Sequence, residues 1–350
     1  MIVIVDLNMT KMNVWSFCRK TGAEKRFLEI PDPGKMSGRR DIEDILKVLC
    51  GRKKPEAVAF RFLFGKHIFS GITRIDDEFF NKAGALMSQF PLYAPWATRI
   101  ARIFYENYER TPMFAFFETA FFAHLPSREK YYALPLEEFK SEEFMRHGFH
   151  GIFHSFNSGR VSSKGKSRII SVVVDKQTSV CSVRKNVPQS ISLGYTPLEG
   201  VMGKTTSGDM DPGIVFHLMR KHKFSIYEIN EMLSNKSGFF GLTGYDLGVD
   251  ELYKYYGRDK KVDLAFDIYT NQVLKYIGEA MSILGGVDDL VFSGSNIKAL
   301  MPLFYRMVKE MSFLGVHLKP LPWDSNADIF SVHSEMSGIG VYVNTASIQK

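Results

Sequence analysis

Residues 192–213 read SLGYTPLEGVMGKTTSGDMDPG. Near the end of this stretch, Asp211 followed by Pro212 predicts the start of a helix, because an aspartate side chain can cap a helix and proline fits its first turn. Two apolar segments that precede the stretch, 168–174 and 179–184, predict a pair of neighbouring strands. The stretch therefore joins strands to a helix within one α/β unit.

The chain after this stretch continues with helices and one short strand. Ser225 and Glu228 fit a capping box at a helix start. The periodic segment 262–284 predicts a long helix that is closed by Gly285 and Gly286. Beyond it, the sequence predicts a buried strand over 289–292, a helix over 297–313 and an extended segment over 315–319.

The first 147 residues predict a second unit of the same class. The expected elements are strands over 2–6, 12–17, 26–30, 57–64 and 113–117, and helices over 41–49 and 136–146. The first three strands form a β-meander. Strands that alternate with helices, twice over, predict two α/β units, and a length of 350 residues also favours two domains. No internal repeat is visible in the sequence.

The composition is that of an ordinary globular protein, and no apolar run is long enough to cross a bilayer. The opening apolar segment is too short for a secretory signal, so we expect a cytoplasmic protein that does not bind membranes. The three cysteines lack metal-ligand spacing and are expected to be idle thiols. The net charge of +7 falls in short basic runs without interleaved aromatic residues, which favours solvated surface over nucleic-acid binding.

Three stretches carry a resemblance to a known family. FETAFF…LP…YALP over residues 117–135, HGFHGIFH over 147–154 and the stretch 192–213 resemble FDTAFH…MP…YALP, YGFHGTSH and SMGFTPLEG…TRSGDIDPG of the acetate kinase family. Weaker matches follow at 237–244 and 291–294. Because the matches keep the order and spacing of the family, the chain is identified as a divergent member of the acetate kinase, or acetokinase, family.

The resemblance implies two ribonuclease-H-like α/β domains of the acetate and sugar kinase, Hsp70 and actin superfamily, with a cleft between them that holds ATP. We accordingly expect an N-terminal domain of residues 1–147 plus 335–350. The C-terminal domain, 148–334, is expected to carry the nucleotide side and the interface of a homodimer. The family uses ATP and Mg²⁺ to convert short-chain carboxylates such as acetate, propionate or butyrate into acyl phosphates. This chemistry joins two anions, so the site needs cations, a metal-directing carboxylate and a backbone cradle for phosphate.

Several residues of the family's active site are kept or conservatively replaced. Arg61 matches the arginine that holds the substrate carboxylate, and a guanidinium can grip a carboxylate with two hydrogen bonds. His150 matches the histidine that steadies the transferring phosphoryl group, although a structural histidine is an equal alternative. Glu118 stands at the catalytic aspartate and Glu335 near the metal-directing glutamate, so both are candidates for Mg²⁺. Tyr93 replaces a family histidine at the substrate-binding position.

The residues that hold nucleotide phosphates are changed at most family positions. The second catalytic arginine is replaced by Thr206, and Lys204 is the nearest candidate for the missing cation. The phosphate-binding HLGNGAS reads VVDKQTS around Lys176, which removes both glycines. The glycine-rich FTAGIGEN reads FSGSNIKA and keeps Gly294 alone. We expect these four residues to border the nucleotide.

The family's opening motif, NAGSSSxK, reads DLNMTKMN here, so its asparagine is Asp6 and its lysine is Asn13. Other members of the superfamily place an aspartate after the first strand to organise metal-bound water. Asp6 either takes that role or replaces the asparagine by coincidence.

Two functions of different classes therefore remain. The first is ATP-dependent phosphoryl transfer to a short-chain carboxylate with weak or altered activity, because several preorganised donors are lost and each loss typically costs about a hundredfold in rate. The second is a non-catalytic relative that acts as a binding or regulatory subunit. A third alternative, a nucleic-acid-binding module, is supported only by the net charge.

Overall fold

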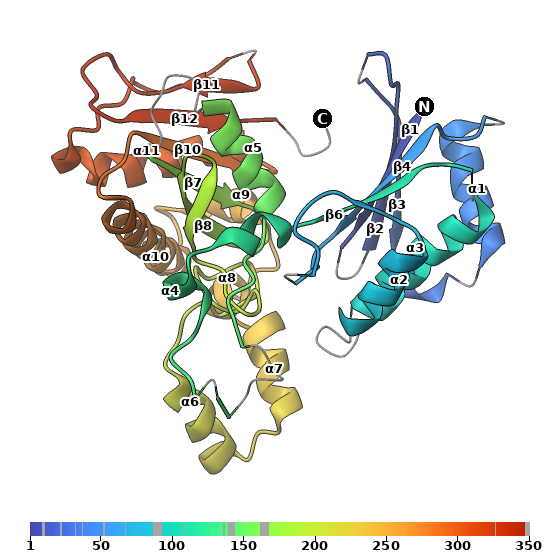
Figure 1. Ribbon diagram of the computed structural model, residues 1–350. Coiled ribbons are helices and arrows are strands. Elements are labelled where there is room, and N and C mark those ends of the chain that lie inside the picture. Colours follow the sequence, from blue (N-terminus) through green and yellow to red (C-terminus); the bar gives the residue numbers. More distant parts are fainter. Residues whose placement is uncertain are drawn as a thin grey trace. The chain divides into compact units, whose positions relative to one another are not determined.

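The computed structural model describes residues 1–8, 11–21, 23–31, 33–36, 38–51, 53–66, 68–86, 93–108, 110–135, 137–138, 144–161, 168–325 and 327–346. The chain divides into two compact units. The first comprises Met1–Ala123, and the second runs from His124 to the last described residue, Ala346. Each unit is built on one six-stranded sheet (Figure 1).

The sheet of the first unit has the strand order β3-β2-β1-β4-β6-β5. Its first three strands form the predicted antiparallel meander, and β1, β4 and β6 run parallel to one another. In β4 and β6 every second residue is buried, as expected for strands with one face toward the core. The strands are β1 Ile2–Leu7, β2 Lys11–Phe17, β3 Glu24–Pro31, β4 Ala57–Phe62, β5 Thr73–Arg74 and β6 Met113–Phe117.

The described part of the first unit also contains three α-helices. In α1, which was predicted over 41–49, the apolar residues recur at helical spacing and are buried. The helices are α1 Arg39–Cys50, α2 Asp77–Ala83 and α3 Ala94–Asn107, with short 3-10 helices at Pro33–Lys35, Gly84–Leu86 and Ala120–His124. Helix α3 packs against both α1 and α2.

The sheet of the second unit has the order β11-β12-β10-β7-β8-β9 and repeats the topology of the first. An antiparallel meander of three strands is again followed by two parallel strands and an antiparallel edge strand. The sequence shows no matching repeat, so the duplication is visible only in the fold. The strands are β7 Arg168–Val174, β8 Thr178–Arg184, β9 Val187–Ile191, β10 Asp289–Gly294, β11 Ile329–Ser331 and β12 Gly340–Asn344.

Helices α5 and α10 cover opposite faces of the second sheet. Ser171 of β7 contacts α5 residues, whereas Ile170 and Val172 belong to the core around α10, and successive residues of a strand point to opposite faces. The helices are α4 Ser127–Lys130, α5 Gly151–Val161, α6 Pro212–His217, α7 Ile226–Asn235, α8 Gly238–Thr243, α9 Val249–Leu252, α10 Lys260–Leu284 and α11 Met301–Glu310. A π-helix spans Leu218–His222, and 3-10 helices span Tyr253–Tyr255, Ile297–Leu300 and Ser312–Leu314.

The helix ends that the sequence predicted are confirmed. Asp211 caps α6 by accepting a hydrogen bond from the Gly213 N–H at 2.7 Å. Ser225 and Glu228 form the capping box of α7. Helix α10 ends at Gly285, which has a φ of 66°, a left-handed conformation that glycine adopts without steric cost.

The prediction of a helix over 136–146 is wrong for the residues of this range that the structure describes. Met145 forms a β-bridge with Tyr131, and residues 137–138 lie in a turn. Arg146 donates to the Ile191 carbonyl oxygen and pairs with Glu199. These tertiary contacts override the local helical pattern. Residues 136 and 139–143 lie outside the described residues.

The predicted domain boundaries differ from the two units. Residues 124–147 were assigned to the N-terminal domain, but they belong to the second unit, to which the contacts of Arg146 attach them. The segment 335–346 was also assigned to the N-terminal domain. It contains β12, which pairs with β10 and β11 in the second sheet. Among the helices of the described ranges, none has both the length and the apolar character needed to cross a membrane.

Candidate active site

Three charged side chains meet where the parallel strands of the first sheet end. Asp6 and Arg61 are register partners on β1 and β4, so their side chains share one face, and Glu118 directly follows β6. The Arg61 Nε donates to Glu118 Oε1 at 2.5 Å, and its Nη1 donates to Asp6 Oδ1 at 3.0 Å. We call these three residues the Arg61 cluster. The structure thus brings together Arg61 and Glu118, as a catalytic role for both requires.

The Arg61 cluster is buried and carries more acid than base. Glu118 is 1% exposed and Asp6 is 4% exposed. Burial raises the pKa of Asp6 above its ordinary value, and the nearby guanidinium and a hydrogen bond from Asn8 offset only part of this shift. Burial also acts to lower the pKa of Arg61, but the two carboxylates outweigh it, and the pKa is raised above its usual range. Arg61 is therefore a permanent cation between two carboxylates.

Tyr93 makes its hydrogen bonds to the backbone. It is 1% exposed, its hydroxyl donates to the Leu7 carbonyl oxygen at 3.0 Å, and it accepts from the Leu63 N–H at 2.8 Å. The Tyr93 hydroxyl therefore links the ends of β1 and β4 through these two hydrogen bonds. Binding of substrate by Tyr93 stays a prediction, and any such contact would have to use its ring or a remaining lone pair.

The oxygen atoms around Asp6 suit a hard cation such as Mg²⁺. With both carboxylates ionised, the Arg61 cluster has one negative charge in excess. The Oδ1 of Asn13, the residue opposite Asp6 on β2, is a buried carbonyl oxygen that accepts no hydrogen bond among the described residues. Carboxylate and carbonyl oxygens are ligands that Mg²⁺ accepts. The donor chemistry of Asp6, Glu118 and Asn13 therefore fits the metal.

His150 lies immediately before α5 in the second unit. Its φ of 62° is unusual for a residue other than glycine. Its Nδ1 lies 2.8 Å from Ser179 Oγ on β8. A side chain held in an uncommon backbone conformation by a specific hydrogen bond is typical of a functional position.

Three of the four predicted nucleotide residues lie together in the second unit. The backbone N–H of Lys204 donates to the Lys176 carbonyl oxygen at 2.8 Å, and Thr206 Oγ1 accepts from the Gly203 N–H at 3.1 Å. The Lys204 ammonium lies 2.7 Å from a carboxylate oxygen of Asp246. Its positive charge is therefore already paired, and the Thr206 hydroxyl serves a local turn.

Gly294 has a packing role that requires a residue without a side chain. Its φ is 156°, and a Cβ added to it would lie 1.9 Å from the Val174 carbonyl oxygen of the adjacent strand. The backbone of β7 thus occupies the space that a side chain would need. The structure gives Gly294 a reason to be glycine that does not involve a nucleotide.

Replacing Gly294 by alanine is expected to destabilise the protein by about 3 kcal/mol, near the upper end for overpacking, because a backbone atom cannot move aside cheaply. The matched control is Gly278→Ala in α10, where a Cβ meets nothing within 4 Å; it should stabilise by about 0.5–1 kcal/mol. Urea unfolding of both variants measures the difference. Equal effects of the two substitutions would contradict the packing role.

Glu335 is exposed in the turn that precedes β12. It belongs to the second unit, whereas Glu118 belongs to the first. Its assignment to Mg²⁺ stays a prediction from the resemblance.

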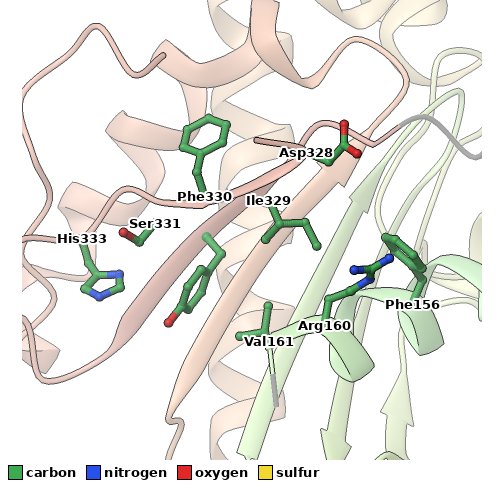
Figure 2. A pocket seen from close by; sticks show the side chains of 9 residues that line it. Phe156, Arg160, Val161, Asp328, Ile329, Phe330, Ser331 and His333 are labelled. Carbon is green, nitrogen blue, oxygen red and sulfur yellow. The ribbon is translucent and has the colours of Figure 1, made fainter. Parts of the chain in front are cut away.

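A pocket of about 700 Å³ lies in the second unit beside β11 and the C-terminal half of α5 (Figure 2). Phe156 and Arg160 line it from the helix, and Ile329 and Tyr342 line it from the strands. None of the predicted site residues lines it, so the pocket does not belong to the candidate active site.

Sequence reasoning missed two features near the predicted residues. One is a chain of buried polar side chains that starts at His150 and includes His154 and Asn157. Its signal was present, because positions 150, 154 and 157 fall on one face of a helix. The other is Lys66, which is 8% exposed and has a φ of 53°, an unusual backbone conformation for a residue other than glycine.

The fold is that of solved carboxylate kinases. The acetate kinase of Porphyromonas gingivalis matches with a TM-score of 0.88 at 22% identity, covering 98% of this chain and 95% of that one. A propionate kinase of Francisella tularensis matches with a TM-score of 0.84 at 22% identity and the same coverage. The chain therefore has the two-domain α/β fold of these two kinases.

The sequence comparisons give the family. The family model for the acetokinase family matches residues 27–343. The acetate kinase of Fervidobacterium nodosum is 32% identical over 305 residues, which cover 85% of this chain and 72% of that protein. This chain belongs to the acetokinase family, as the resemblance predicted.

Proposed function

We propose that the protein transfers the γ-phosphoryl group of ATP to a short-chain carboxylate, with weaker activity than an acetate kinase that keeps all the family residues. Membership of the family supports the reaction class. The observation that carries the proposal is the Arg61 cluster, a buried guanidinium between two carboxylates at the ends of β1, β4 and β6. Charges buried at such a position are typical of functional sites.

The reaction requires positioning rather than proton transfer. A carboxylate oxygen forms a bond to the γ-phosphorus while the bond from that phosphorus to the β,γ-bridging oxygen breaks. The products are an acyl phosphate and ADP, and the charge balances without a proton, because the carboxylate is already ionised at neutral pH. The protein must therefore offset the repulsion between two anions and hold them in line.

Arg61 would orient the carboxylate, and His150 would donate a hydrogen bond to an oxygen of the transferring phosphoryl group. Members of the family generally use Mg²⁺, which would offset the charge of the phosphates. Asp6, Glu118 and Asn13 would hold the metal, because they supply hard oxygen donors beside an excess negative charge.

Three features support weak rather than full activity. Arg61 donates hydrogen bonds to two of the protein's own carboxylates, so a substrate carboxylate would have to compete for this guanidinium. Thr206 stands where the family has a second catalytic arginine. Lys204, the nearest substitute, is paired with Asp246. Each loss of a preorganised donor typically costs about a hundredfold in rate.

The pairing of Arg61 with Glu118 and Asp6 also favours a second candidate function. If Asp6 and Glu118 hold the guanidinium permanently, the Arg61 cluster is a structural element of the first unit. The chain would then be a non-catalytic relative that acts as a binding or regulatory subunit.

Calorimetric titration of the purified protein with ATP and Mg²⁺ separates these candidates. Saturable binding, followed by carboxylate-dependent formation of acyl phosphate detected as its hydroxamate, supports the kinase. Saturable binding without product supports a regulatory subunit. Absence of binding at millimolar nucleotide would end the kinase proposal.

We also propose that the protein is a homodimer through the arm formed by α6, the π-helix and α7, which extends from the body of the second unit (Figure 1). Helix α6 buries none of its residues. Large apolar side chains are exposed along the arm, namely Ile214, Phe216, Met219, Ile226 and Tyr227. Exposed apolar patches of this kind mark interfaces. The arm also carries both a basic run, 220–223, and acidic residues of α7, so a symmetric pairing can match opposite charges.

Phe216→Asp is expected to convert the dimer into a monomer, because a charge would be buried at the interface. Phe216 is 68% exposed, so the substitution should not disturb the folded chain. The control is Phe313→Asp, at a residue that is 81% exposed outside the arm. Light scattering after gel filtration measures the mass. A wild-type monomer, or a Phe216→Asp dimer, would contradict the proposed interface.

A further inference from the structure

A buried chain of hydrogen bonds runs across the second sheet beneath α5 and ends at His150. Its members come from four strands and one helix, and all except His150 are at most 3% exposed. In order from the far end they are Asn344, Asn157, Ser171, His154, Ser179 and His150, with Ser293 as a side branch. A continuous chain of buried hydrogen bonds has a defined direction if one of its ends is fixed.

The far end is fixed by a backbone group. The Ala346 N–H can only donate, and it donates to Asn344 Oδ1 at 2.9 Å. The Asn344 amide nitrogen must then face Asn157, and it donates to Asn157 Oδ1 at 2.7 Å. This orients the second amide, so that Asn157 Nδ2 donates to Ser171 Oγ at 2.9 Å and to Ser293 Oγ at 2.8 Å.

The direction then passes through His154. Because Ser171 Oγ accepts from Asn157, its own proton is directed to His154 Nδ1 at 2.8 Å. The remaining ring proton of His154 lies on Nε2, which donates to Ser179 Oγ at 2.9 Å. Burial, followed by the neighbouring His150, holds the pKa of His154 well below its ordinary value, so the imidazole is neutral and has one N–H.

The last link sets the state of His150. Ser179 Oγ accepts from His154, so its hydroxyl proton is directed to His150 Nδ1 at 2.8 Å. A neutral His150 that accepts at Nδ1 carries its proton on Nε2, at the other edge of the ring. The reverse direction is disfavoured, because Ser171 Oγ would then accept from both Asn157 and His154, and its own buried proton would have no acceptor among the described residues.

We propose that this chain fixes His150 as the Nε2–H tautomer, with Ser179, His154 and Ser171 as positioning residues. Resting on the phosphoryl transfer proposed above, the consequence is that His150 acts as a neutral hydrogen-bond donor to the phosphoryl oxygens through Nε2. Because the tautomer is fixed before substrate binds, no free energy of reorganisation is needed at His150 during the reaction.

The test is the tautomer of His150 in the full-length protein, read from long-range ¹H–¹⁵N correlations of the histidine rings. The wild type is expected to show a protonated Nε2 and an unprotonated Nδ1. Ser179→Ala removes the direct partner and should give a mixture of tautomers. Ser171→Ala should also change the His150 spectrum, although Ser171 does not contact His150, because the direction of the chain is lost at His154.

The control is Ser158→Ala in α5, a buried serine whose hydroxyl donates to the Ser155 carbonyl oxygen and takes no part in the chain. It should leave the His150 spectrum unchanged. A protonated Nδ1 in the wild type would overturn the proposal. So would a His150 tautomer that neither Ser179→Ala nor Ser171→Ala alters.

Kinetics separates this proposal from the proposed function. If acyl phosphate forms, Ser179→Ala should lower kcat by about ten- to a hundredfold, the effect typical of losing an outer hydrogen-bond partner, while KM for the carboxylate stays unchanged. A higher KM with an unchanged kcat would contradict the role in phosphoryl transfer. If the wild type makes no acyl phosphate, the proposed function fails, and the spectra still decide whether the chain fixes the tautomer.

Discussion

Replacing Arg61 by methionine is expected to lower the free energy of unfolding by about 3–5 kcal/mol at neutral pH, because it leaves buried carboxylates without their cation. Arg61 holds Glu118 and Asp6, which are almost fully buried. Methionine keeps much of the length of the side chain, so the loss reports charge rather than a cavity. Urea unfolding of the wild type and the variant measures the change.

The matched control is Arg39→Met, which removes an arginine that pairs with Glu43 on the exposed side of α1. An exposed pair one helical turn apart contributes only about 0.3–0.5 kcal/mol. If Arg61→Met cost no more than this control, the Arg61 cluster would not be a buried ionic centre.

The pH dependence of the Arg61→Met variant has a definite sign. Asp6 already has a raised pKa in the folded protein, and removing the guanidinium that lowers it raises it further. A carboxyl group with a raised folded pKa favours the folded state at low pH, and this stability is lost as the pH rises through that pKa. The destabilisation should therefore shrink as the pH falls from 7 toward the ordinary aspartate value of about 4.

The sequence predicted those parts of the fold that depend on local signals. The meander, the cap at Asp211, the capping box at Ser225 and the glycine stop at Gly285 are each specified by a few adjacent residues, and the structure confirms them. The helix predicted over 136–146 failed because distant partners, Tyr131 and Glu199, decide the conformation around it.

The candidate active site was predicted only as separate residues. The resemblance pointed to Arg61 as a substrate ligand and to Glu118 as a metal ligand, but their ion pair depends on strand register, which places Asp6 opposite Arg61. Register is a long-range property that a local pattern does not contain. The buried chain from His150 was missed for the same reason, since its serines lie on three different strands.

Asp6→Asn is expected to strengthen binding of the carboxylate substrate about ten- to a hundredfold. Asparagine is the residue of the family motif at this position, and it removes the negative charge that competes with a substrate for Arg61. A charge-assisted hydrogen bond released from Asp6 and offered to the substrate contributes about 1.5–3 kcal/mol, and every 1.4 kcal/mol is about tenfold in affinity. The KM for acetate or propionate in the hydroxamate assay measures the change.

The same substitution should also make the protein more stable at neutral pH. Because burial raises the pKa of Asp6, its ionised form opposes folding above that pKa, and asparagine does not ionise. The control is Asp44→Asn, which neutralises an exposed acid of α1 and should change neither KM nor stability. Because Asp6 is also a proposed metal ligand, KM is measured at saturating Mg²⁺; an unchanged or higher KM in Asp6→Asn under these conditions would show that Asp6 does not compete with the substrate. A variant that gains stability without any turnover would instead identify the Arg61 cluster as a structural element and favour the non-catalytic function.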